Sequence, residues 1–254
     1  MLGPFAAVTP KGQIAMHEDR KHDMVMSYHR VRTALGLLGM ALPCVLLLGG
    51  LIDYHRIEPS ISDFYHTIYR DIFVGTLCAI GVFLICYRGY GRTPGDVIDD
   101  DWLGTVAGIS AFGVALFPNE SPTAQVATMT QNMVGMGTSP LVHYASALVF
   151  FACLAVFCLS KFTRGAQPGR RVIYRICGWI ILCALIGIAL ASVLKIFGTG
   201  PARAIVVANN LVFWFEAVGI WAFGLSWLVK GKADIGLARL AGKLPLDDED
   251  QVRS

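Results

Sequence analysis

The residues with the most chemical potential lie in a polar segment between two apolar runs. This segment, DYHRIEPSISDFYHTIYRD, covers residues 53–71. Within it, Asp63, His66 and Arg70 recur at a spacing of three and four residues, which places them on one face of a helix. A carboxylate and an imidazole can transfer protons or bind a metal, and a guanidinium can grip a phosphate or carboxylate. The spacing predicts a site, with an ordinary amphipathic interfacial segment as the alternative.

The local pattern also suggests how this segment folds. Pro59 is expected to break any helix before it, and Ser62 is a suitable N-cap for a helix that follows. We therefore expect one helix to run from Ser62 through Arg70 into the next apolar run.

Glu216 is the most informative single residue, because it lies inside an apolar run directly after the aromatic triplet FWF. A carboxylate at membrane depth costs about 2.5–3.5 kcal/mol on insertion scales. We therefore expect Glu216 to face the interior of a helix bundle, close to a partner or a ligand. A structural contact with Lys195 or His143 and an ion, proton or substrate site are both consistent with this position.

The candidate site residues divide by role. The candidates for catalysis are Asp63, His66, Asp71 and His143. The candidates for ligand binding are Arg70, Asn209, Glu216 and Lys195, with Asn209 expected on the same helix face as Glu216. Zinc is the candidate cofactor, since imidazole and carboxylate groups form its catalytic sites. Its predicted ligands are His66, His143 and Asp71.

These side chains need a scaffold, and the composition predicts one that lies in a membrane. Apolar types make up 55% of the chain and charged types 15%, with a mean hydropathy of +0.57. A soluble domain is about a quarter charged, so lipid must solvate much of this surface. Each apolar run is predicted to be a spanning helix, because lipid cannot satisfy the backbone of an open strand. The six runs are Thr33–Ile52, Ile72–Tyr87, Trp102–Phe117, Leu141–Ser160, Ile176–Leu194 and Ile205–Val229.

The basic residues predict the orientation. With both termini inside, only Arg56, Arg70, Lys195 and Arg203 of the 21 basic residues fall in outer segments. The positive-inside rule therefore favours cytoplasmic tails at residues 1–30 and 231–254 around a transmembrane domain at residues 31–230. The net charge of +3 includes no dense basic stripe, so no nucleic-acid partner is expected. Gly104 and Gly108, four residues apart, predict a close contact between two helices.

Several stretches resemble a family of uncharacterised bacterial six-span membrane proteins. The longest is SISDFYHTIYRDIFVGTLCAIGVFLICYRGY, and others are GVALFPNE, VHYASALVFF, RVIYRICGW and FWFEAVGIWAFGLSWLVKG. The resemblance covers most of residues 56–232 and implies a six-span protein of the bacterial cytoplasmic membrane. More distantly, the six runs and the tetrapeptide SISD resemble the DRAM/Sfk-type membrane proteins, which are linked to lipid and membrane homeostasis. Neither resemblance assigns a catalytic residue.

The polar set also resembles that of the alkaline ceramidase and adiponectin-receptor superfamily. Those membrane hydrolases use Ser, Asp and three His around zinc in a seven-span fold. This chain departs from that pattern, because it has six apolar runs and no H-x-x-x-H pair within a run.

The sequence thus predicts an all-α integral membrane bundle of six transmembrane helices with a polar pocket that opens outward. We expect the pocket to bind or hydrolyse a lipid or an anionic headgroup, with membrane lipids as partners. A small proton- or ion-coupled transporter that uses Glu216 and a scaffold without chemistry are the alternatives. Oligomerisation is compatible with the sequence.

Overall fold

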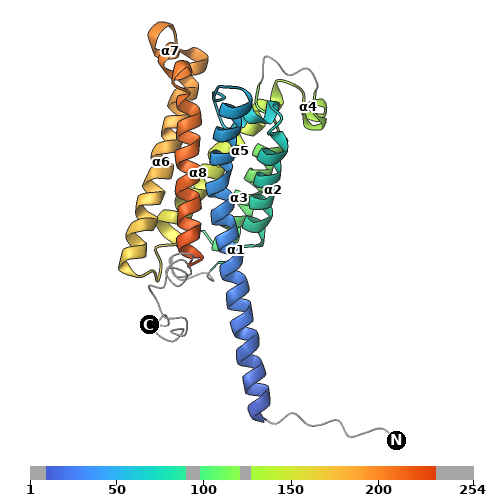
Figure 1. Ribbon diagram of the computed structural model, residues 1–254, viewed down its shortest axis with the longest axis vertical. Helices are drawn as coiled ribbons and strands as arrows, with labels where there is room; N and C mark the ends of the chain where they lie inside the picture. Colours follow the sequence, from blue (N-terminus) through green and yellow to red (C-terminus); the bar gives the residue numbers. More distant parts are fainter. Residues whose placement is uncertain (1–9, 90–97, 121–126, 233–254) are drawn as a thin grey trace, which may run out of the picture.

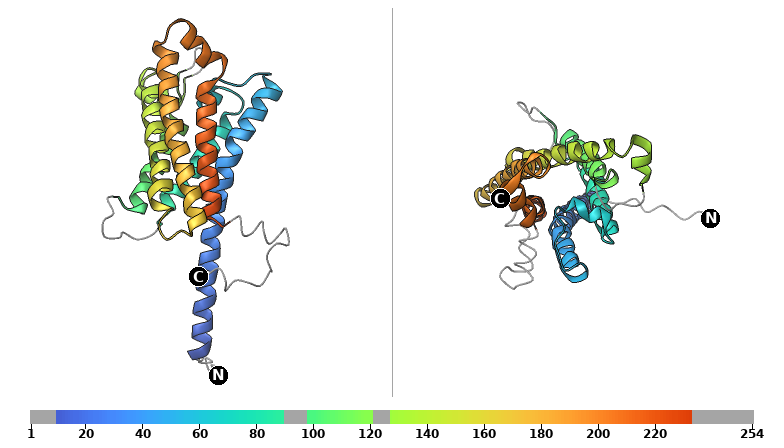
Figure 2. Two further views of the ribbon diagram at one scale, coloured as in Figure 1. Left: turned by 90° about the vertical axis from the view of Figure 1, so that its left-hand side faces the viewer. Right: turned by 90° about the horizontal axis from the view of Figure 1, so that it is seen from above.

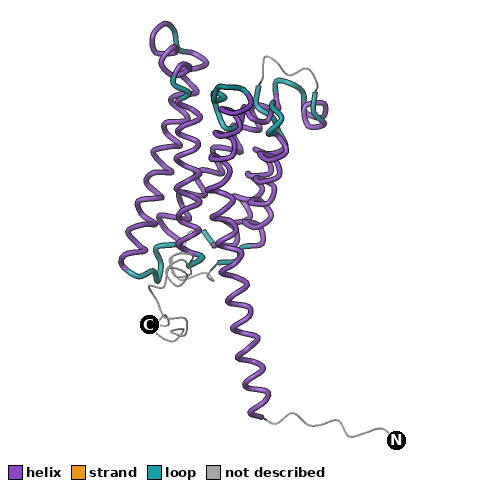
Figure 3. Tube along the Cα trace, viewed as in Figure 1, coloured by secondary structure: helices purple, strands orange, loops and turns teal. Residues whose placement is uncertain are grey.

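The computed structural model describes residues 10–89, 98–120 and 127–232, apart from the side chains of residues 10–27 and 196. Within these ranges the chain folds into helices and connecting loops, without a strand (Figure 3). The predicted all-α class is therefore confirmed for the described residues.

Six long helices form the body of the molecule. They are α1 (Pro10–Asp53), α2 (Arg70–Cys86), α3 (Asp100–Leu116), α5 (Thr138–Val156), α6 (Pro168–Phe197) and α8 (Leu211–Lys230). Four shorter elements join or extend them. These are the 3₁₀-helix η1 (Ser62–His66), α4 (Met129–Val134), the π-helical turn η2 (Phe157–Lys161) that continues α5, and α7 (Gly200–Ala208).

The long helices pack in a ring. Each contacts the next long helix along the chain, and α8 closes the ring against α1. Successive helices run in opposite directions, as Figure 1 shows, and Figure 2 shows the bundle from the side and from above. We call the end that holds η1, α4 and α7 the upper end, as in Figure 1, and the opposite end the lower end.

Four of the described helical segments are long and apolar enough to cross a membrane. They are Tyr28–Asp53, Thr138–Lys161, Pro168–Lys195 and Leu211–Lys230. The helices α2 and α3 have 17 residues each, the lower limit of about 17–25 residues for a spanning helix. Large apolar side chains such as Trp102, Leu141 and Phe197 are exposed on the outside of the bundle. These features are those of a membrane protein.

Glycines allow the closest helix contacts, as the sequence predicted for Gly104 and Gly108. A Cβ atom at Gly104 would lie 2.6 Å from the carbonyl oxygen of Leu84, and one at Gly108 would lie 2.5 Å from that of Gly81. Both distances are too short for a real Cβ, so α2 and α3 approach this closely only because these residues are glycines.

The predicted continuous helix from Ser62 into α2 is wrong. Ser62 is the first residue of η1 instead of its cap, and the chain turns extended at Thr67 before α2 begins at Arg70. The hydroxyl of Thr67 donates to the carbonyl of Phe64 at 2.8 Å and accepts from the backbone N–H of Tyr69 at 3.1 Å. These side-chain bonds compete with helix continuation.

Two other boundaries differ from expectation. The run Ile205–Val229 is broken, because α7 ends at Ala208 and Asn210 adopts a left-handed conformation (φ 47°) before α8 begins. Asn tolerates that conformation better than most residues. At the other end of the chain, α1 begins at Pro10, so it includes much of the predicted N-terminal tail. Most of the predicted C-terminal tail lies outside the described residues.

Candidate functional site

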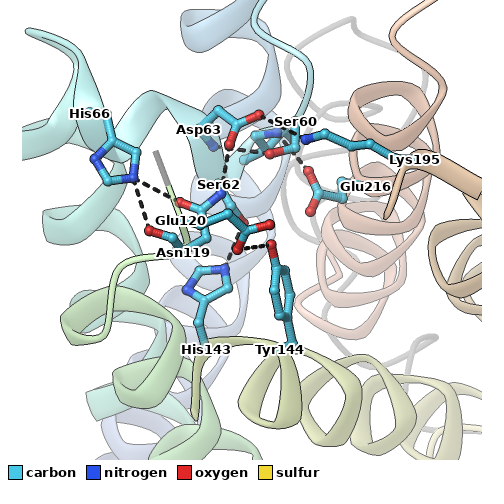
Figure 4. Close-up of polar contacts among 11 residues, drawn as sticks. Ser60, Ser62, Asp63, His66, Asn119, Glu120, His143, Tyr144, Lys195 and Glu216 are labelled. Carbon is cyan, nitrogen blue, oxygen red and sulfur yellow. Dashed lines mark hydrogen bonds and ion pairs between the residues drawn. The ribbon is translucent and has the colours of Figure 1, made fainter. Parts of the chain in front are cut away.

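Polar side chains from four parts of the chain converge at the upper end (Figure 4). The loop before η1 is held on α8, where the N–H of Phe213 donates to the carbonyl of Pro59 at 3.1 Å. The N–H of Ile61 donates to Oε2 of Glu216 at 2.6 Å. Ile61 is the N-cap of η1, so the carboxylate of Glu216 satisfies a backbone donor that would otherwise be free at the helix start. These bonds fix η1 over the upper end of α8.

Ser62 and His143 form the central pair. The Nε2 atom of His143 lies 2.9 Å from Oγ of Ser62, and its Nδ1 atom lies 2.7 Å from the carbonyl oxygen of Phe117. A carbonyl only accepts, so Nδ1 carries the proton and the neutral ring offers the Nε2 lone pair to Ser62. The serine hydroxyl therefore donates to the imidazole. Ser62 is 7% exposed and His143 is 1% exposed.

A second chain of hydrogen bonds lies beside this pair. Nε2 of His66 donates to Asn119, whose Oδ1 is 3.0 Å away and whose backbone oxygen is 3.2 Å away. The Nδ2 group of Asn119 donates to Oδ1 of Asp63 at 2.6 Å. Nζ of Lys195 lies 3.9 Å from the other oxygen of Asp63. This network connects η1 with the loop after α3 and the end of α6.

A cavity of about 270 Å³ lies below these groups. Its polar lining includes Ser62, His143, Lys195 and Glu216. Its apolar lining comes from α5, α6 and α8 and consists of Ala147, Leu148, Phe151, Leu185, Ile188, Ala189, Val193 and Val212. Leu148 and Val193 are each 53% exposed, so the cavity opens sideways on the bundle surface between α5 and α6.

A second, polar cavity of about 560 Å³ adjoins the first. It is lined largely by the loop before η1 and by η1 itself, and its titratable lining residues are Tyr54, Arg56, Glu58, Asp63, His66, Glu120 and Lys195. Glu120 and Lys195 line both cavities. The site thus consists of an apolar compartment and a polar compartment, with Ser62 and His143 on the apolar side of their junction.

The structure brings five of the predicted residues together, namely Asp63, His66, His143, Lys195 and Glu216. Arg70, Asp71 and Asn209 line neither cavity, so the structure does not bring them together with the other five. Arg70 is exposed, and its guanidinium donates to the hydroxyl of Tyr65 at 2.8 Å and stacks on that ring. Asp71 is exposed, and Asn209 ends α7 with its amide bonded back to Ile205.

The geometry does not fit the predicted zinc site. Within the described ranges, no group of three His, Cys, Asp or Glu side chains is placed to hold a metal ion. Both ring nitrogens of His143 are bonded, to Phe117 and to Ser62, and Nε2 of His66 is bonded to Asn119. These bonds occupy both ring nitrogens of His143 and one of the two in His66, and imidazole binds zinc through these atoms.

Ser62, Asn119 and Tyr144 were not predicted as members of the site. Ser62 lies four residues before His66 in the stretch quoted above, but its partner His143 is 81 residues away. The hydroxyl of Tyr144, one residue after His143, donates to Glu120 at 2.5 Å. The residue type alone does not indicate a contact with a side chain far away in the sequence, so only the fold reveals these contacts.

Another polar contact joins α1 and α2 at the upper end, and we call this place the rim of the site. The hydroxyl of Tyr69 donates to the carboxylate of Asp53, which joins the start of α2 to the end of α1. This hydrogen bond raises the pKa of Tyr69 above its ordinary value of 10.0, because it stabilises the protonated phenol.

Comparisons with known proteins identify no relative of this chain: no protein-family model, no curated protein and no solved structure matches it. The resemblances drawn from the sequence therefore stay predictions, and the function has to be inferred from the site itself.

Proposed function

We propose that this chain is a six-span protein of the bacterial cytoplasmic membrane that binds an amphipathic membrane lipid at its upper end. The observation that carries the proposal is the two-compartment cavity. It has apolar walls, a polar mouth and an opening between α5 and α6. A soluble ligand would not need an opening that faces the side of a spanning bundle.

The placement of the ends supports the orientation. Buried bases lie at the lower end, where Arg32, Lys161 and Lys230 are each at most 8% exposed. Positive residues are retained on the cytoplasmic side of a membrane. We therefore assign the lower end to the cytoplasm and the upper end, with the cavity, to the outer leaflet.

The two compartments fit the two halves of a lipid. An acyl chain can lie along the apolar walls formed by Phe151, Leu185 and Ile188. A chain that leaves the bilayer for this cavity gains little, because lipid tails are already apolar. Selectivity among lipids must therefore come from the polar compartment, which would contact the headgroup.

The charges of the polar compartment favour a zwitterionic or hydroxyl-rich headgroup. Its lining includes three carboxylates, those of Glu58, Asp63 and Glu120, against the two bases Arg56 and Lys195. The guanidinium of Arg56 lies 3.3 Å from the carboxylate of Glu58, and Nζ of Lys195 lies 3.9 Å from that of Asp63. The sequence suggested that Arg70 would bind an anionic headgroup. Arg70 lines neither compartment, so it cannot bind a headgroup there.

A transporter that uses Glu216 is less well supported. Its carboxylate accepts the N–H of Ile61 at 2.6 Å and so serves as a fixed acceptor that holds η1. A group that must load and release a cation or proton in each cycle would break this contact each time.

Lipid binding can be tested by filling the opening. In Ala189→Trp, the indole would fill the opening of the apolar cavity between α5 and α6. Leu190→Trp places the same group at the neighbouring lipid-facing position, which does not line the cavity. We expect the protein with Ala189→Trp to lose binding of a fluorescent acyl lipid, measured in micelles, and that with Leu190→Trp to keep it. Equal binding by the two variants would contradict a lipid site in this cavity.

A further inference from the structure

We propose that Ser62 is a nucleophile, activated by His143, that cleaves a carboxylic ester bond of an acyl lipid held in the apolar cavity. This inference rests on the lipid-binding function proposed above and adds a reaction to it.

The hydrogen-bond geometry supports this role. The carbonyl of Phe117 accepts from Nδ1 of His143 at 2.7 Å, and this bond fixes both the tautomer and the orientation of the ring. The opposite nitrogen then lies 2.9 Å from Oγ of Ser62 with its lone pair available. A serine that donates to an oriented imidazole is the arrangement in which a weak hydroxyl nucleophile becomes reactive. Here a backbone carbonyl takes the place of the third, orienting group.

The position of the pair in the cavity favours chemistry over a purely structural contact. Ser62 and His143 both line the space that opens between α5 and α6. Lining the cavity is not sufficient by itself, since Ser60 also lines it while its hydroxyl accepts the N–H of Asp63 at 3.0 Å and caps the local turn. The contact with His143 is what distinguishes Ser62.

The reaction balances with water as the co-reactant. Oγ of Ser62 attacks the carbonyl carbon of the ester while its proton passes to Nε2 of His143. The C–O bond to the alcohol then breaks, and the imidazolium gives that proton to the departing alkoxide. Water next attacks the acyl-serine and gives a proton to His143. The fatty acid leaves, and the proton returns to Oγ of Ser62.

The surroundings match the two products. The acyl chain would remain along the apolar walls, and the headgroup alcohol would leave through the polar compartment, which meets the first at Glu120 and Lys195. Lys195 contributes a positive charge to the lining of the apolar cavity. Its ammonium can offset the negative charge that develops on the carbonyl oxygen.

A fluorophosphonate probe tests the nucleophile directly, because its phosphorus bonds to an activated serine oxygen as fluoride leaves. The full-length protein in micelles would be treated with the probe, and the modified peptide would be identified by mass spectrometry. We expect modification of Ser62 in the wild type and in Ser110→Ala, which removes a hydroxyl that donates to the carbonyl of Val106 on α3 and lines neither compartment. In His143→Gln, which can keep hydrogen bonds to both neighbours, we expect the labelling rate to fall by about 10²-fold or more.

Hydrolysis of a fluorogenic octanoyl ester gives the second measurement. Ser62→Ala should abolish it, whereas Ser110→Ala, on α3 and outside both compartments, should leave it close to wild type. Labelled Ser62 whose rate is unchanged in His143→Gln would overturn the proposed pair. Folded wild-type protein that binds acyl lipid but is neither labelled at Ser62 nor able to hydrolyse the ester would overturn this inference and leave the lipid-binding proposal intact. Labelling of Ser62 without any acyl-lipid binding would reject the lipid-binding proposal instead.

Discussion

The two ends of the bundle bury polar groups in different ways. At the upper end, the buried polar side chains are neutral, and they include Ser62, Asn119, Ser139 and His143. Each of these four makes a hydrogen bond to another side chain or to a backbone carbonyl. At the lower end, the buried polar side chains include four charged ones, Arg32, Asp100, Lys161 and Lys230, beside the neutral Ser226.

Aromatic rings surround the charges of the lower end. The guanidinium of Arg32 lies 3.9 Å above the ring of Tyr28, and Nζ of Lys230 lies 5.1 Å from the centre of the Phe162 ring. Among the described residues, the buried side-chain N and O atoms without a hydrogen-bond partner all lie near this end. They are Nδ1 of His29, Nε of Arg32, the hydroxyl of Tyr87 and Nε1 of Trp227.

This difference shows what each end can do. Hydrogen bonds are directional, so the upper network fixes the positions and tautomers of its members, as a reaction or a selective site requires. Charge and cation–π attraction depend less on angle, so they suit a contact that holds helices together without fixing one exact geometry. We therefore expect changes at the lower end to act on stability and changes at the upper end to act mainly on ligand chemistry.

The largest stability effect should come from the buried ion pair of the lower end. Nζ of Lys161 lies 2.9 Å from Asp100, and both side chains are at most 5% exposed. Because Asp100→Asn removes the carboxylate that neutralises a buried lysine, it should destabilise the protein by about 3–5 kcal/mol. Chemical unfolding in micelles measures the loss, with exposed Asp101→Asn as the matched control.

A double variant sharpens this prediction. Replacing Lys161 with Met in the Asp100→Asn background removes the uncompensated charge and should recover much of the lost stability. If Asp100→Asn unfolds at the same denaturant concentration as Asp101→Asn, the lower end is not stabilised by buried charge, and the contrast between the ends fails.

A smaller effect is expected from Glu216 at the upper end. Glu216→Leu leaves the N–H of Ile61 without its acceptor, which should cost about 1–3 kcal/mol. Glu216→Gln keeps an acceptor oxygen and should cost less, with lipid binding retained. The unfolding midpoints of the two variants measure this difference. If Glu216→Leu is more stable than the wild type, Glu216 faces lipid. If Glu216→Gln folds normally but loses proton-coupled uptake, the transporter is favoured.

Much of this fold follows from the sequence, because burial in lipid demands long apolar runs and leaves few alternatives to helices. The break at Thr67 and the break at Asn210 were not predicted as breaks. Each depends on local bonding or backbone conformation, which the hydrophobic pattern does not report. The closure of the ring by α8 on α1 is equally invisible in a run of apolar residues.

The site was predictable in outline for a simple reason. Successive helices alternate in direction, so His66, His143 and Lys195 had to lie at the same end once the runs were counted. The contacts within that end were not predictable. Arg70 leaves the site because it stacks on Tyr65, and Ser62 enters it through a partner 81 residues away. Such pairings depend on the angles between helices and on single rotamers.

The smallest effect should come from the rim of the upper end, where the hydroxyl of Tyr69 donates to the exposed carboxylate of Asp53. The bond raises the pKa of Tyr69 in the folded state, so its contribution is fully present below the unfolded value of about 10. It is lost as the pH rises through the higher folded value, because the phenolate cannot donate to a carboxylate.

Wild-type stability should therefore fall with rising pH above about 10 more steeply than that of Tyr69→Phe, which lacks the titrating group. Thermal unfolding across this pH range compares the stability of the wild type and Tyr69→Phe. Tyr54→Phe is the control, because Tyr54 is a nearby tyrosine whose hydroxyl accepts from the N–H of Ile68. Other groups titrate in the same range in all three proteins, so the difference between curves isolates Tyr69. Because this contact is solvent-exposed, the difference should be well below that for Asp100→Asn. A difference as large as the loss for Asp100→Asn would mean that the rim stabilises the bundle as strongly as the buried ion pair does. That outcome would contradict the contrast between the two ends.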